Sequence, residues 1–288
     1  MKKIHFACLL LLTSSCTSFA NEANCMKEVV QTNAFNNFIL FEEIGPNDSL
    51  KEMKVRIKGI DDYLNGDSTV KFDECGALLS MKGNQTKKFK NNDHVLISDS
   101  QVSMNKTGKD WDYEFGFKMS IIDKDGKEID LVQQKVKGQF LTDEKGKINK
   151  AIDSSDTVVS GEETKGSSIT KYKVNEDGKV SETIQLGTLP TDNSVKKYFY
   201  DEDGRLIKSQ TESTTEEFSY DDKGRDLSVT SVQELFTTET SITTCKSWNE
   251  SGRCTKAEIN ASTLFKGENG KKDETRTNQA EVTFDLIY

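Results

Sequence analysis

Cysteines are the residues of this 288-residue sequence whose type and spacing point most directly to chemistry. Four of them, Cys25, Cys75, Cys245 and Cys254, follow an N-terminal targeting segment that is described below. An even number of cysteines in an exported chain favours two disulfides over free thiols. Cys245 and Cys254 are nine residues apart, so proximity favours this pair and leaves Cys25 for Cys75.

The local strand register argues against the Cys245–Cys254 pair. If Asn249 to Gly252 forms a type I turn with a G1 bulge, Trp248 lies opposite Cys254. Alternation along the strand then places Cys245 on the opposite face from Cys254. The disulfide requires an extra residue before Trp248 or a looser turn, and the other connectivities remain open.

Residue types that support catalysis are scarce in this chain. His94 is the only histidine after the targeting segment, which leaves little room for histidine-dependent catalysis. Acid pairs such as Glu42-Glu43 and Asp61-Asp62 are common in so acidic a chain. A hydrolase that used Asp and Glu alone would need a cleft with two carboxylates in unequal environments.

Metal sites are equally poorly supported. Asp123-Lys124-Asp125-Gly126 begins like a calcium loop but lacks the later oxygen ligands and the bidentate glutamate. His94 has no cysteine, histidine or paired acid near it in the sequence. We therefore expect no catalytic residue, no cofactor and no metal ion.

The first twenty residues have the organisation of a signal peptide. Two lysines precede a short apolar run from 4 to 12, and Ser18-Phe19-Ala20 is a small-x-small cleavage site. We expect cleavage between Ala20 and Asn21, and export to the periplasm or cell envelope. An alternative is a lipoprotein signal that ends at Cys16, with Thr13 where leucine is usual; lipid on Cys16 would then anchor the protein to a membrane.

The charge of the chain excludes some partners. The formal net charge is -9, and removal of Lys2 and Lys3 with the signal peptide makes it -11. An acidic chain without a basic run argues against nucleic acid and against charge-driven binding to anionic lipid. Membrane association would therefore come only through a lipid on Cys16.

One short phrase recurs along the chain and predicts its architecture. It consists of a β-favouring residue, Asp or Asn, two polar residues, Gly and usually a basic residue, at 72–76, 122–127, 142–147, 174–179, 200–205, 220–225 and 248–253. Asp or Asn caps the turn with its side chain, and Gly accepts a positive φ. The repeated phrase predicts a chain of β-hairpins with G1 bulges.

Residues between these turns alternate as β-strands do. From Trp111 to Ile121 every second residue is large and apolar, which predicts a strand with one buried face. Val282, Phe284 and Leu286 alternate up to Tyr288, so we expect the chain to end inside the sheet.

The fold expected from these patterns is all-β, an antiparallel meander of roughly ten to fifteen strands that forms a curled open barrel or a two-layer sheet. We expect a signal peptide at 1–20 and a single domain at 21–288, with a candidate linker at 187–194 that would divide it into 21–190 and 191–288. A short strand is expected at Phe38–Phe41, and loops at 82–94 and 151–168.

Two resemblances add to this interpretation. The turns at Tyr200-Asp201 and Tyr220-Asp221 resemble the Tyr-Asp repeats of Rhs-type proteins, over roughly Tyr198 to Arg253. Most of the mature chain resembles the YnfC-like family of enterobacterial envelope lipoproteins. That resemblance is carried by Ile44-Gly45-Pro46, the segment 72–79, a Tyr-Asp turn in the second half, the cysteines that bracket the last such turn, and the aromatic C-terminus. It implies an envelope address and lipid on Cys16.

The function predicted from these features is a non-enzymatic β-scaffold of the cell envelope that presents loops to an unknown partner. A first alternative is a periplasmic carrier that binds an apolar ligand inside a curled sheet. A second, weaker alternative is a hydrolase that depends on Asp and Glu.

Overall fold

The structure, a computed structural model, describes residues 25–42, 50–91, 94–235, 237–266 and 272–288. The expected cleavage between Ala20 and Asn21 and the alternative lipid site at Cys16 lie outside the described residues. None of the helices in the described ranges combines the length and apolarity needed to cross a membrane.

The described residues form one α-helix, two short 3-10 helices and sixteen β-strands. They are α1 (Lys27–Phe41), β1 (Glu52–Gly59), η1 (Ile60–Asp62), β2 (Leu64–Phe72), β3 (Leu78–Asn91), β4 (His94–Thr107), β5 (Asp110–Ile122), β6 (Glu128–Thr142), β7 (Ile148–Val159), β8 (Glu162–Val174), β9 (Val180–Gly187), η2 (Pro190–Asp192), β10 (Ser194–Tyr200), β11 (Leu206–Gln210), β12 (Thr214–Tyr220), β13 (Asp226–Glu234), β14 (Thr238–Trp248), β15 (Cys254–Phe265) and β16 (Glu274–Ile287).

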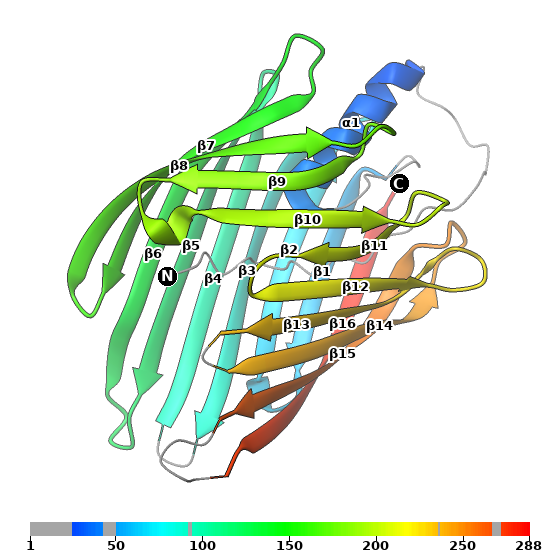
Figure 1. The fold of residues 1–288 in the computed structure, drawn as a ribbon. Coiled ribbons are helices and arrows are strands. Elements are labelled where there is room, and N and C mark those ends of the chain that lie inside the picture. Colours follow the sequence, from blue (N-terminus) through cyan, green and yellow to red (C-terminus); the bar gives the residue numbers. More distant parts are fainter. Residues whose placement is uncertain (1–24, 43–49, 92–93, 236, 267–271) are drawn as a thin grey trace.

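The strands form one closed antiparallel barrel (Figure 1). Each strand pairs with its neighbours in sequence, and β16 returns to pair with β1 from Glu52↔Ile287 to Gly59↔Ala280. The prediction of an antiparallel meander is confirmed, as is the expectation that the chain ends in the sheet. The open barrel and the two-layer sheet were wrong, because β16 satisfies the backbone edge of β1 along that strand's whole length.

The repeat turns are the hairpin turns that the sequence predicted. Their glycines have φ between 73° and 81°, and are Gly76, Gly126, Gly146, Gly178, Gly204, Gly224 and Gly252. In the turn that begins at Asp143, the carboxylate accepts hydrogen bonds from the N–H groups of Lys145 (2.8 Å) and Lys147 (3.0 Å). The side chain therefore caps the turn while the glycine takes the left-handed conformation.

Most repeat turns lie at the same end of the barrel. Successive turns of a meander alternate between the two ends, so the turns β2/β3, β6/β7, β8/β9, β10/β11, β12/β13 and β14/β15 lie together. We call this the helix end, because α1 contacts it, and the opposite one the far end. The repeat turn at Asp123, between β5 and β6, lies at the far end.

A ladder of aromatic rings connects consecutive turns at the helix end. Each ring stands just before a repeat turn, donates a hydrogen bond to a backbone carbonyl after the previous repeat turn, and lies under the basic side chain of that previous turn. The members are Tyr200 with Val180 (2.7 Å) and Lys179, Tyr220 with Leu206 (2.8 Å) and Arg205, and Trp248 with Asp226 (3.2 Å) and Arg225. The recurring basic and aromatic positions of the phrase therefore bind one turn to the next.

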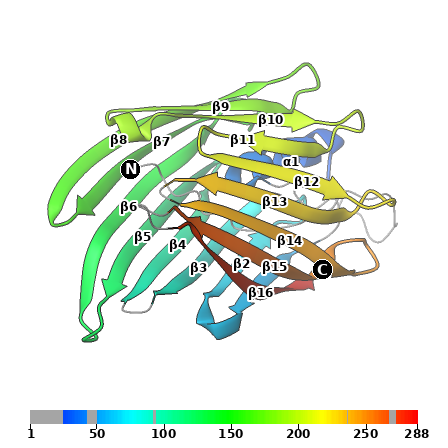
Figure 2. The ribbon, with the colours of Figure 1, turned by 60° about the horizontal axis from the view of Figure 1, so that its bottom comes forward.

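Helix α1 lies between the two walls of the barrel, with strands β9–β15 on one side and β2–β6 on the other (Figure 2). The short strand expected at Phe38–Phe41 was wrong, because these residues form the last turn of α1. The buried residues of the helix include Asn33, Asn36 and Asn37 beside Phe38 and Leu40. A helix that is buried largely through amides has no continuous apolar stripe, and so no helical periodicity shows in the sequence.

The loops expected at 82–94 and 151–168 were also wrong, because most of the described residues of both segments form strands. Residues 82–91 and His94 belong to β3 and β4, and 151–168 belongs to β7 and β8 except for the turn at 160–161. Ser155 and Thr157 are buried on the inner face of β7, whereas Asp156 between them pairs with Lys165 on the outside. These polar segments form strands because both faces of this barrel accept polar side chains.

Candidate ligand-binding site

The lumen contains a cavity of ≈ 190 Å³ in the half of the barrel toward the far end. Its position follows from the residues that line it, which lie next to turns at the far end. Leu64 begins β2 after the turn β1/β2, Glu239 follows the turn β13/β14, and Thr211 and Thr214 flank the turn β11/β12. The helix end of the lumen is filled by α1 and by a large apolar core that includes Met53, the most deeply buried methionine there.

The cavity wall is divided into polar and apolar parts. Two polar faces oppose each other, with Gln85, Ser98 and Ser100 on β3 and β4, and Ser231, Gln233 and Ser241 on β13 and β14. The apolar side chains on the wall are Ile57, Leu64, Phe115, Phe117, Ile259 and Ala261. Such a wall can contact an apolar body and also hydrogen-bond a polar group.

An ion pair crosses the lumen between the two polar faces. Lys87 on β3 donates to Glu239 on β14 at 2.5 Å, although the residues are 152 positions apart. The ammonium of Lys87 also lies 5.5 Å from the ring centroid of Tyr63 and 4.9 Å from that of Phe89. Burial raises the pKa of Tyr63 well above its ordinary value, and the nearby Glu239 carboxylate adds to the rise.

A second ion pair network connects the cavity to α1. Lys196 on β10 lines the cavity and donates to Glu216 on β12 at 3.1 Å and to Glu42 at the C-terminal end of α1. Ser209 donates to the Glu216 carboxylate at 2.6 Å, and the Tyr198 hydroxyl donates to Glu42 at 3.0 Å. Burial favours a lower pKa for Lys196, but the two carboxylates outweigh burial and its pKa is raised.

The carboxylates on the cavity wall are not arranged for hydrolysis. Glu216 and Glu239 are each held by a lysine, so neither resembles the isolated, desolvated acid that a general acid requires. Elsewhere in the lumen Asp153 accepts hydrogen bonds from the hydroxyls of Tyr113 (3.0 Å) and Ser168 (2.9 Å). Among the described residues no group of three potential metal ligands is found.

The structure joins Cys25 to Cys75, with a Cα–Cα distance of 5.7 Å. Cys25 precedes α1, and Cys75 lies in the repeat turn between β2 and β3. The amide of Asn33 adds a hydrogen bond of 2.9 Å to the Cys75 carbonyl. This disulfide therefore ties the start of the helix to the rim of the barrel.

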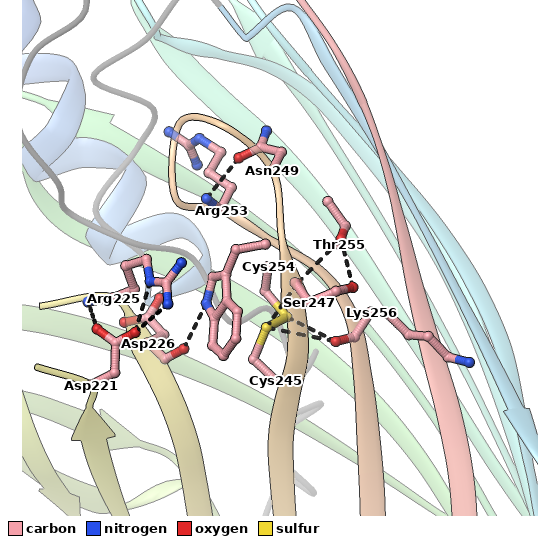
Figure 3. Close-up of a disulfide and its surroundings, with 11 residues drawn as sticks. Asp221, Arg225, Asp226, Cys245, Ser247, Asn249, Arg253, Cys254, Thr255 and Lys256 are labelled. Atoms are coloured by element: carbon pink, nitrogen blue, oxygen red, sulfur yellow. Dashed lines mark hydrogen bonds and ion pairs between the residues drawn. A yellow bond between two sulfur atoms is a disulfide. The ribbon is translucent and has the colours of Figure 1, made fainter. Parts of the chain in front are cut away.

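The structure also joins Cys245 to Cys254, with a Cα–Cα distance of 5.9 Å (Figure 3). Trp248 does pair with Cys254, as the turn register requires. The conflict is resolved by two local irregularities: Cys245 pairs with Ala257 and Ser247 with Lys256, so the ladder skips Lys246 on β14 and Thr255 on β15. Because one residue is skipped between Cys245 and Trp248, Cys245 lies on the same face as Trp248 and Cys254.

Sequence reasoning missed the lysines and glutamates inside the barrel. Lys196 and Tyr198 are two residues apart on β10 and are both buried in the structure. Their spacing is typical of one face of a strand, but only the pairing of the whole barrel decides that this face points into the lumen. His94 is the exposed first residue of β4. Phe115 and Phe117 of the strand from Trp111 line the cavity, whereas none of the described residues considered for catalysis, metal binding or disulfides does.

Comparison with known proteins gives no family. No family model and no curated protein matches the chain. In overall shape it is similar to the crystal structure of a porin-like protein from Bacteroides uniformis, with 10% identity and a TM-score of 0.43, over 84% of this chain and 99% of that chain. It is also similar to a bacterial polysaccharide outer membrane secretin, with 6% identity and a TM-score of 0.31, over 83% of this chain and 99% of that chain.

Proposed function

We propose that this protein is an exported, non-enzymatic β-barrel carrier that holds a small, uncharged amphiphilic ligand in its lumen. The observation that carries the proposal is the divided wall of the ≈ 190 Å³ cavity. Phe115, Phe117 and Ile259 supply apolar contact, while hydroxyl and amide groups of the facing strands supply hydrogen bonds. The ligand is therefore amphiphilic rather than purely apolar.

The charges on the wall argue for an uncharged ligand. Lys87 and Lys196 are the lysines of the cavity wall, and each is already paired with a glutamate. A charged ligand would have to displace one member of a pair and leave the other partly buried without compensation, which is strongly unfavourable. A neutral polar group can instead bind the serine, threonine and glutamine side chains of the wall.

The outer surface supports a carrier that works in water. Lys54, Arg56 and Lys58 are exposed on β1, and cross-strand ion pairs such as Lys137–Glu114 and Lys256–Glu281 lie elsewhere on the outside. A lysine or arginine on the lipid-facing side of a membrane barrel costs roughly 2–4 kcal/mol at mid-bilayer. We infer that the barrel stands in the aqueous space of the envelope, an address that its disulfides and its resemblance to YnfC-like proteins support.

Probe binding tests the proposal. In detergent-free buffer the full chain should bind the neutral fluorophore N-phenyl-1-naphthylamine, with enhanced and blue-shifted emission. Ser241→Phe places a ring in the cavity and should weaken binding by about tenfold or more, equivalent to 1.4 kcal/mol. Thr240→Phe is the matched control, because Thr240 is the neighbour whose side chain alternates to the outside.

Two outcomes would contradict the carrier. One is no binding by the wild-type protein; the other is equal weakening by the Ser241 and Thr240 variants. Organic extraction of protein purified from envelopes without detergent, followed by mass spectrometry, would identify the natural ligand.

A second candidate, the scaffold that presents loops to a partner, is favoured by one observation. Six repeat turns are collected at the helix end, where their central residues are mostly exposed. Chemical cross-linking in intact envelopes tests it: a partner attached through Lys145 or Lys223, which lie in these turns, supports the scaffold. Cross-links confined to other lysines would count against it.

A further inference from the structure

We infer that α1 is a releasable plug of the barrel and that Lys196, from inside the cavity, is the latch that holds its C-terminal end. The inference goes beyond ligand binding, since it concerns how one end of the lumen opens. It depends on three features of α1: its amide contacts, its ion pair with the cavity wall and its covalent tether.

The middle of α1 is held by hydrogen bonds that water can replace. The Asn36 amide donates to the Gly146 carbonyl and accepts from the Ile148 N–H, both at 2.8 Å. Asn37 makes the same pair of bonds to Gly76 (2.7 Å) and Leu78 (3.1 Å). These partners are turn glycines and the first residues of β7 and β3, all at the rim of the barrel, where the freed groups can bind water once the helix moves away.

The C-terminal end of α1 is held differently. Glu42 has φ 61°, the left-handed conformation that ends the helix, and its N–H donates to the Phe38 carbonyl. Its carboxylate accepts from Lys196 and from Tyr198, while the Phe38 ring packs edge-on against Tyr198 at 5.2 Å. Lys196 is only 9% exposed, whereas the Glu42 side chain is 35% exposed, so this contact is partly shielded from water and from salt.

Lys196 is the residue that links the plug to the ligand cavity. It lines the cavity, and its ammonium is shared between Glu216 on the wall and Glu42 on the helix. Lys87 lines the same cavity but pairs with Glu239, which belongs to the wall rather than to the helix. Loss of the Lys196 ammonium should therefore free the helix, whereas loss of the Lys87 ammonium should not.

The Cys25–Cys75 disulfide fixes the N-terminal side of the plug. It joins the segment before α1 to the turn β2/β3, so this side stays at the rim when the C-terminal end of the helix leaves the lumen. The plug would therefore swing on its N-terminal side.

Amide hydrogen exchange followed by mass spectrometry tests the latch in the full, oxidised chain. Lys196→Met should speed exchange of peptides within residues 27–42 by about tenfold or more while strand peptides keep their protection. Glu42→Gln, which alters only the helix side of the contact, should act in the same direction. Lys87→Met is the matched control and should leave α1 protected.

Two results would overturn the inference. Unchanged exchange of α1 in both latch variants would mean that the asparagine contacts and the apolar packing of Phe38 and Leu40 hold the helix without the latch. Equal acceleration throughout the barrel would mean that Lys196 supports the strands rather than the plug. If Lys196→Met does not fold, Glu42→Gln decides alone. These measurements use no ligand, so they stand whether or not the carrier proposal holds.

Discussion

The guanidinium of Arg225 lies over the indole of Trp248, 4.2 Å from the ring centroid, and the indole N–H donates to the backbone carbonyl of Asp226 at 3.2 Å. The carboxylate of Asp221 holds the guanidinium from the other side at 2.7 Å. The ladder steps that start at Arg205 and Arg225 thus each combine a carboxylate, a cation, a ring and a carbonyl, whereas the turn of Lys179 has Asn175 in place of the carboxylate. The ladder connects local turns into a continuous rim.

The ladder makes a prediction at Tyr220. Tyr220→Phe keeps the ring under Arg205 but removes the 2.8 Å hydrogen bond to the Leu206 carbonyl. The free energy of unfolding should fall by about 0.5–1.5 kcal/mol in urea titrations. Tyr288→Phe is the control, since the Tyr288 hydroxyl bonds at an exposed position and its loss should matter less. Equal losses of unfolding free energy would show that the hydrogen bond to the Leu206 carbonyl contributes no more to stability than the exposed one of Tyr288.

Asp226 predicts a pH dependence of stability. It occupies the inward position two residues after the turn glycine, where the other turns at the helix end have Leu78, Ile148, Val180, Leu206 and Cys254. Burial raises the pKa of Asp226 from 3.8 to about 7, with Arg253 opposing the rise and Asp221 adding to it. The folded state then holds the proton more tightly than the unfolded chain does.

The free energy of unfolding should therefore fall as the pH rises from about 4 to about 7 and level off above that. A shift of this size corresponds to at most about 4 kcal/mol, at 1.36 kcal/mol per pKa unit. Asp226→Asn should remove that part of the slope, whereas Asp222→Asn, at an exposed position of the same turn, should retain it. Parallel curves for the wild type and Asp226→Asn would refute the assignment.

Closure of the barrel predicts a large loss of stability for inward substitutions on the last strand. Phe284 is 4% exposed and lies opposite Val55 in the β1/β16 pair. Phe284→Ala should cost about 3–5 kcal/mol. The adjacent Asp285 is exposed, so Asp285→Ala should change stability by no more than about 0.5 kcal/mol. Similar melting temperatures for the two variants would mean that β16 does not pack on the core.

The N-terminus remains a prediction from the sequence. Ser18 and Ala20 suit signal peptidase, so the mature protein should begin at Asn21. Intact-mass spectrometry of the envelope form is the measurement. A mass that begins at Cys16 and includes acyl chains would show instead that the protein is lipid-anchored.

Local features of this protein could be predicted from the sequence because they depend on neighbouring residues. The Asp143 turn needs only a capping carboxylate and a glycine three positions later, and the alternation from Trp111 needs only a strand. The same reasoning failed at α1, where Asn36 and Asn37 are buried by turns far away in sequence. No local pattern shows that such amides will be satisfied.

Tertiary structure alone decided the closure, the lumen and the site. Residues 52–59 pair with residues 280–287 only because the twist of every intervening hairpin adds up to a closed barrel. This total twist cannot be predicted from the sequence of any single strand. The Lys87–Glu239 pair likewise depends on which strand faces which across the lumen. Cys245 and Cys254 share a face because the ladder skips Lys246 on β14 and Thr255 on β15. Short-range hydrogen bonding fixed the turns, whereas long-range register placed the charges, because a one-residue shift moves a side chain from water to the lumen.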